Sequence, residues 1–175
     1  MKLNFIVVLV FSFIFLAMGV GYKIRKMEKC AGNNKHISVE KCFVIDETLL
    51  NLKINVIVGL DYSLFKLSVF KKNNDGEFKE LFKNLPALNW CKVMDGTSKY
   101  ASNFLMKIVM VLYKTKFPEF FQRCPFGPMV VEKINMTIEN KLIVMMPTGL
   151  YRITFTFKYK NGEMMFDQSF LIEIL

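Results

Sequence analysis

The sequence is poor in the residue types that most catalytic and metal sites need. Its single histidine, His36, lies among asparagines and lysines, where we expect an exposed side chain without a partner. General acid–base catalysis usually needs a histidine or converging carboxylates. The cysteines form no Cys-x-x-Cys pair, which argues against zinc. The sequence also has no glycine-rich phosphate loop and no nucleophile-elbow serine. We therefore expect a protein that is not an enzyme and holds no metal or cofactor.

Long apolar runs are also scarce, and the longest lies at the N-terminus. Lys2 precedes an apolar run over residues 5–18, and small residues follow at Gly19 and Gly21. This layout predicts a signal peptide over residues 1–21, with cleavage near Gly19 or Gly21. An uncleaved signal anchor is the alternative, because basic residues follow closely. The run is shorter than the roughly 20 residues that span a membrane, so we expect a secreted, extracellular protein.

Secretion gives the four cysteines a structural meaning. An even number of cysteines in an oxidising compartment predicts two disulfides. Four cysteines allow three pairings, and we favour the sequential one, Cys30–Cys42 and Cys91–Cys124. In the chain-entropy model, closing the longer loop should add about 3–4 kcal/mol of stability.

Two surface properties follow from the same compartment. Asn135-Met136-Thr137 is an N-glycosylation sequon, which predicts that Asn135 faces solvent; an unused sequon is the alternative. The formal net charge of +9 favours anionic membrane surfaces or acidic glycans as partners, and we expect no nucleic acid outside the cell. The lysines are scattered along the sequence, so a solvated basic surface is the simpler interpretation.

The last 25 or so residues contain the clearest structural pattern. Apolar or aromatic side chains alternate with polar ones at Tyr151, Ile153, Phe155, Phe157 and Tyr159. A period of two indicates a strand with one apolar face, and Asn161-Gly162 predicts a two-residue type I′ hairpin. In that register Tyr159 faces Met164, Phe157 faces Phe166, Phe155 faces Gln168 and Ile153 faces Phe170. Gln168 alone interrupts the apolar face, which needs a second layer to cover it.

Strand patterns recur along the rest of the chain. They cover residues 49–60, 63–72, 77–82, 129–138 and 141–146. We expect the first three to form an antiparallel meander, and residues 30–46 to form an irregular or hairpin segment. Helical spacing occurs over residues 98–116, between a capping Ser98 and Pro118. This pattern predicts an all-β fold with two antiparallel sheets, one helix, and a single domain over residues 28–175.

The order of short motifs carries a family resemblance. The motifs are Lys29-Cys30, Lys41-Cys42-Phe43, Cys91 before the helix, Cys124-Pro125-Phe126, and Pro147, Gly149 and Tyr151 in a Pro-x-Gly-x-Tyr pattern. Together they resemble a large family of small secreted insect proteins of undetermined function. That family is grouped with the ML-type lipid-recognition proteins and is similar to the CheB proteins implicated in fly contact-pheromone sensing. The resemblance covers about residues 28–175. It implies an ML-like, immunoglobulin-like β-sandwich that admits a lipid between its sheets.

Composition agrees with an apolar binding site. The sequence has 18 Phe and 12 Met but one Trp, and flexible Met and large Phe side chains suit an irregular apolar cavity. Our leading hypothesis is a secreted, non-catalytic protein that holds a lipid, fatty acid or pheromone-like hydrocarbon between two sheets, with a role in chemosensation. The candidate cavity residues are Val56, Val58, Phe155, Phe157, Phe166 and Phe170. The alternative is an extracellular protein-interaction module, or an accessory factor for a receptor, with a filled core. A cavity on the order of several hundred Å³ favours the first, and a filled interior with an exposed apolar patch favours the second.

Overall fold

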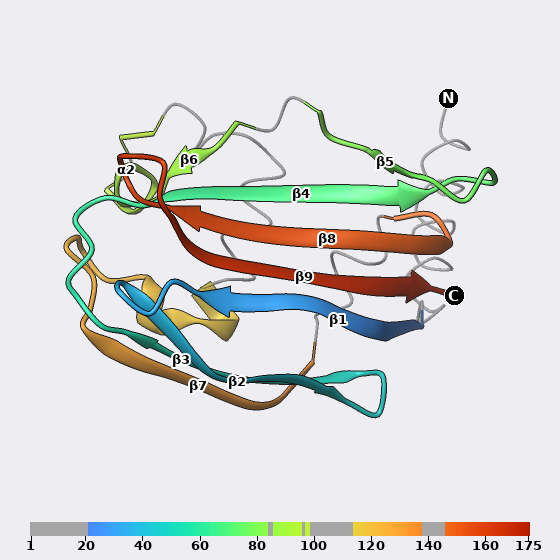
Figure 1. Cartoon of the computed structure of the whole chain (residues 1–175), viewed down its shortest axis with the longest axis horizontal. Coiled ribbons are helices and arrows are strands. Elements are labelled where there is room, and N and C mark those ends of the chain that lie inside the picture. The colour runs from blue at the N-terminus through green and yellow to red at the C-terminus, as the bar shows by residue number, and fades with distance from the viewer. Residues whose placement is uncertain (1–20, 84–85, 96, 99–113, 138–145) are drawn as a thin grey trace, which may run out of the picture.

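The computed structural model of the chain describes residues 21–83, 86–95, 97–98, 114–137 and 146–175. These residues form a two-sheet antiparallel β-sandwich (Figure 1), which confirms the predicted fold class. The large sheet has the order β1-β9-β8-β4-β5, with β6 also paired to β4, and the small sheet has the order β2-β3-β7. The elements are β1 (Tyr22–Gly32), β2 (Ile37–Ile45), β3 (Leu49–Val56), β4 (Leu64–Lys72), β5 (Phe78–Glu80), β6 (Leu88–Asn89), α2 (Trp90–Met94), η1 (Pro118–Phe120), β7 (Met129–Thr137), β8 (Gly149–Lys158) and β9 (Met164–Ile174).

The core has two large clusters between the sheets, and a third, small cluster holds Leu88 and Val93. Alternate side chains point inward because strands have a period of two; on β3 the buried ones include Leu52, Ile54 and Val56. The first core cluster is Ile37, Leu52, Ile54, Val56, Leu60, Phe65, Trp90, Cys91, Phe120, Phe126, Val131, Phe157, Met165 and Phe166. The second core cluster is Ile24, Val69, Tyr151, Phe170, Ile172 and Ile174. Both clusters draw on β8 and β9, and in the first cluster residues of the small sheet cover the apolar ribbon at the end of the chain.

The predicted register of that ribbon is right along the strands and wrong at the turn. Phe157 pairs with Phe166, Phe155 with Gln168, and Ile153 with Phe170. At the turn, however, Lys158 rather than Tyr159 pairs with Met164. The Tyr159 N–H donates to the Glu163 carbonyl (2.8 Å), and Gly162 has a φ of 84° while Asn161 is not left-handed. The connection is therefore a three-residue loop that ends on a left-handed glycine, and a bulge restores the register.

The expected meander is right for its second and third strands, because β4 and β5 pair antiparallel, and wrong for its first, because β3 belongs to the small sheet. The chain crosses between the sheets after Val56. There, Leu60 exchanges backbone hydrogen bonds of 2.9 and 3.1 Å with Phe126, so the strand ends early. At the other end, β1 begins at Tyr22, ahead of the expected domain boundary at residue 28. Alternation shows that a strand has one buried face, but it does not show to which sheet the strand belongs.

Three predictions fall partly or wholly on residues outside those that the structure describes. These are the signal peptide over residues 1–21, most of the helix over residues 98–116, and the strand over residues 141–146. Residues 114–116 at the end of the expected helix are helical. Within the described part of the chain, no helix has the length and apolar character to cross a membrane.

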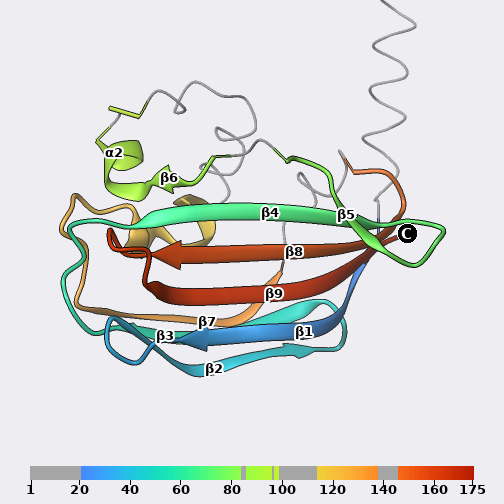
Figure 2. The same ribbon diagram turned by 45° about the horizontal axis from the view of Figure 1, so that its top comes forward.

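The disulfides have the predicted pairing. Cys30 on β1 bonds to Cys42 on β2, with a Cα–Cα distance of 6.3 Å, and Cys91 on α2 bonds to Cys124 at a Cα–Cα distance of 5.6 Å. Because β1 and β2 lie in different sheets, the first disulfide joins the sheets along the side where these strands lie next to each other (Figure 2). Two disulfides fit an oxidising compartment.

Candidate functional site

A small apolar cavity lies between the sheets inside the first core cluster. Its walls are Ile37, Leu52, Ile54, Phe117, Phe120, Phe126, Phe157, Phe166 and Gln168. The small sheet supplies the three aliphatic residues, and β8 and β9 supply Phe157, Phe166 and Gln168. The cavity volume of about 30 Å³ is enough for roughly two water molecules. Typical ligand pockets measure about 300–1,000 Å³, so phenylalanine rings fill most of this space.

The third wall comes from the segment around η1, which Figures 1 and 2 place at the same end of the sandwich as α2. Pro118 starts this 3₁₀ turn. Phe117, just before the turn, and Phe120, its last residue, both line the cavity. We call Phe117 and Phe120 the phenylalanine plug. The Phe120 ring lies edge-on to Phe126, with centroids 6.0 Å apart, and stacks on Phe157 at 6.5 Å. The plug therefore occupies space between the sheets.

A few specific contacts hold the plug. Trp90, which is fully buried, donates from Nε1 to the Phe120 carbonyl at 3.1 Å. Glu119 accepts a hydrogen bond from Lys133 Nζ on β7 at 2.7 Å, and that same Nζ lies 5.8 Å from the Phe117 ring centroid. The other oxygen of Glu119, Oε2, is buried and finds no partner in the described residues. Because the Glu119 side chain is 33% exposed, solvent weakens this ion pair, and the contact stabilises the plug only slightly.

Gln168 is the one polar side chain among the described residues of the cavity wall. It lies on the inner face of β9, pairs with Cys30 on one side and Phe155 on the other, and is 7% exposed. Its Nε2 donates to Sγ of Cys42 at 3.7 Å, and sulfur is a weak acceptor. The sequence marked Gln168 as the interruption of an apolar face but not as a candidate for the site. An isolated amide at an inward-facing position was the signal that would have identified it.

The structure distributes the predicted cavity residues over several environments. Phe157 and Phe166 line the cavity. Val56 is buried in the first core cluster behind the wall. Phe170 lies in the second core cluster and stacks on Phe155 with centroids 5.8 Å apart. Val58 is wrong as a cavity residue, because it follows the end of β3 and is 41% exposed. Sequence periodicity missed Phe117, Phe120 and Phe126 because they lie in irregular segments.

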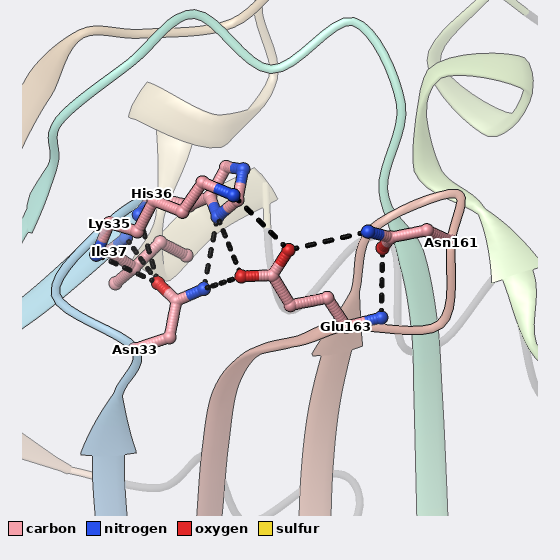
Figure 3. Close-up of polar contacts among 6 residues, drawn as sticks. All are labelled: Asn33, Lys35, His36, Ile37, Asn161 and Glu163. Atoms are coloured by element: carbon pink, nitrogen blue, oxygen red, sulfur yellow. Dashed lines mark hydrogen bonds and ion pairs between the residues drawn. The ribbon is translucent and has the colours of Figure 1, made fainter.

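His36 is buried, which contradicts the expected exposed side chain. It is 7% exposed and stacks on Tyr159 with ring centroids 5.1 Å apart. Figure 3 shows it beside Asn33 and Glu163: His36 Nδ1 lies 3.0 Å from Asn33 Nδ2 and 3.9 Å from Glu163 Oε1. Asn33 Nδ2 also donates to Glu163 Oε1 at 3.1 Å. The expectation failed because it treated the segment as a free loop, whereas the turn after β1 packs against the turn between β8 and β9.

This His36 cluster (Asn33, His36, Tyr159 and Glu163) closes the end of the sandwich next to the cavity residue Ile37. A hydrogen bond from Asn161 is the main cause that lowers the pKa of Glu163, and the charge of Lys35 adds to it. The contacts in the cluster join two turns from different parts of the chain, and we assign it a structural role.

The predicted glycosylation site lies on the outside of the small sheet. Asn135 is exposed and left-handed, with a φ of 53°, in a bulge of β7. Its backbone N–H donates to Asn51 Oδ1 at 2.8 Å, which holds the bulge to β3. The side chain is accessible, and its modification remains a prediction.

No protein-family model matches this chain, and no curated protein matches it. Among solved structures, a Niemann-Pick type C2 protein from Japanese carpenter ant is similar, at 12% sequence identity and a TM-score of 0.34. The match covers 86% of this chain and 96% of the ant protein. A similarity of this size carries no argument about ligand or mechanism, and the link to the CheB proteins stays a prediction.

Proposed function

We propose that this protein is a secreted, non-catalytic binding protein that takes the apolar part of one hydrophobic molecule between its two sheets. The observation that carries the proposal is the cavity in the first core cluster, which has eight apolar side chains and one amide in its walls. Buried ligand sites typically combine such an apolar lining with few polar groups.

The size of the cavity determines how a guest would enter. About 30 Å³ does not hold an alkyl chain, so binding requires the phenylalanine plug to leave the space between the sheets. Exposing two phenylalanine side chains costs about 3–6 kcal/mol. Each CH₂ group that the ligand buries contributes about 0.8 kcal/mol of binding free energy. The first roughly four to eight CH₂ groups therefore only offset the cost of exposing the two rings. Association has its own entropic cost, and the proposal therefore predicts a threshold in chain length.

A protein-interaction module is the second candidate, and two observations favour it. The described interior is mostly filled, and Phe43, Val130 and Ile134 on the small sheet are 48%, 57% and 70% exposed. These side chains belong to β2 and β7 and point away from the core. Single exposed apolar residues are common on protein surfaces, so they make a weaker case than an apolar cavity with a displaceable wall.

A thermal-shift series separates the two candidates. The secreted protein, stripped of lipid, is melted with primary alcohols of increasing chain length. The proposal expects no shift below about eight carbons and a shift that grows with each added CH₂. A melting temperature that does not change with chain length over the whole series would contradict the proposal and favour the interaction module.

A further inference from the structure

Within the described residues, the buried amide of Gln168 makes a single, long hydrogen bond. A glutamine side chain has two N–H donors and an acceptor oxygen with two lone pairs. The only hydrogen bond that this amide makes within the described residues is the long one, 3.7 Å, from Nε2 to Cys42 Sγ. Its neighbours on the inner face, Cys30 and Phe155, have no side-chain oxygen or nitrogen. Burying such a group without partners is unfavourable.

The space beside this amide suits a small uncharged group. Gln168 borders the cavity, whose volume of about 30 Å³ is close to what one or two small polar groups occupy. A hydroxyl group can both donate to and accept from an amide, whereas an ester or aldehyde oxygen can only accept. The partner that Gln168 lacks in the protein is therefore one that the end of a bound lipid can supply.

Charge argues against an anionic head group in the same place. Among the residues that the structure describes, no charged side chain lines the cavity. Beside the plug, Glu119 and Lys133 are paired with each other at 2.7 Å. A carboxylate or phosphate beside Gln168 would be buried without a counter-ion, which is far less favourable than burying a neutral polar group.

We propose that Gln168 is the residue that selects the ligand's head group, and that the ligand is a neutral lipid with one hydroxyl or carbonyl group at the end of a long apolar chain. This inference rests on the proposed function of the same cavity and names the ligand class. An alcohol should bind best, an unsubstituted hydrocarbon less well, and a fatty-acid carboxylate worst.

Four probes with chains of similar length test the inference: hexadecanol, methyl palmitate, hexadecane and palmitate at neutral pH. Trp90 is the single tryptophan of the sequence and its Nε1 bonds to the Phe120 carbonyl, so its fluorescence reports movement of the plug. The wild type should bind hexadecanol about fivefold more tightly than hexadecane, the effect of one neutral hydrogen bond, and palmitate more weakly than both. Methyl palmitate should fall between hexadecanol and hexadecane.

The variant Gln168→Met keeps the length of the side chain and removes the amide. It should lose the preference for hexadecanol and bind hexadecane as tightly or more tightly, because the buried hydroxyl no longer has a partner. Leu67→Met is the matched control, because Leu67 pairs with Phe155 in the same row of the large sheet and carries no polar group. That control should keep the preference for the alcohol.

The outcomes separate the inference from the function on which it rests. Equal binding of hexadecanol and hexadecane by the wild type, retention of the alcohol preference in Gln168→Met, or tightest binding of palmitate would each overturn the role of Gln168 and leave a lipid-binding cavity in place. If the wild type binds none of the four probes, the proposed function fails and the head-group inference fails with it.

Discussion

Replacing Phe120 by alanine would remove half of the phenylalanine plug and leave its backbone attachment in place. The ring is 8% exposed and contacts Phe126 and Phe157 in the cavity wall. The Phe120 carbonyl, which accepts the hydrogen bond from Trp90, does not depend on the side chain. The substitution therefore enlarges the cavity without releasing η1.

The expected magnitudes follow from the loss of a buried ring. A Phe→Ala change in a core typically costs about 3–5 kcal/mol of unfolding free energy. About 1.5–3 kcal/mol of this is the transfer of the side chain. The remaining roughly 1.5–2 kcal/mol, at about 24 cal/mol per Å³, corresponds to about 60–80 Å³ of new space. Because the ligand no longer has to displace this ring, its affinity should rise roughly tenfold to a hundredfold.

Urea unfolding with and without hexadecane measures both effects. The matched control is Phe170→Ala, since Phe170 is 6% exposed but lies in the second core cluster, away from the cavity wall. Both variants should lose similar stability without ligand, and only Phe120→Ala should gain affinity. If Phe120→Ala binds hexadecane no better than the wild type, or if Phe170→Ala gains as much, entry through the plug is refuted.

Three further predictions concern the frame around the site. Replacing both Cys30 and Cys42 by alanine should lower the free energy of unfolding in urea by about 3 kcal/mol. The reason is that the loop between them, of sequence separation 12, is no longer closed in the unfolded chain. An unchanged urea midpoint would show that the disulfide does not constrain the unfolded chain. Thr137→Ala removes the sequon but keeps the left-handed Asn135, so mass spectrometry of the secreted protein should show loss of the glycan; a wild type with the bare polypeptide mass would contradict this. The lowered pKa of Glu163, ordinarily 4.5, means that its contribution to stability is complete above its unfolded-state pKa and is lost as the pH falls through the folded value. Thermal melts of the wild type should therefore fall more steeply on acidification than those of Glu163→Gln, and parallel curves would argue against this linkage.

The parts of the structure that local patterns encode could be predicted. The alternation over residues 151–159 specified the inward face of β8, and the pairing of Phe157 with Phe166 followed from the position of the turn. Two of the predicted cavity residues line the cavity for this reason. The predicted strand pairing was right despite the wrong turn type, because a bulge beside Met164 compensates for the extra residue in the loop.

The parts that depend on contacts between distant segments could not be predicted. His36 is buried because the turn after β1 packs against Tyr159 of a turn more than a hundred residues away. Val58 lies outside the core because the strand ends before it, where Leu60 pairs with Phe126. No strand pattern in the sequence predicts this contact. The plug residues lie in an irregular segment whose position is set by Trp90 and by the disulfide of Cys124.

Native mass spectrometry of the protein secreted from insect cells tests the central claim most directly. We expect a protein with no free thiols that carries one neutral lipid, lost on mild activation, in addition to any glycan. A spectrum that shows only protein and glycan, even after incubation with hexadecanol, would contradict the claim that a guest enters between the sheets.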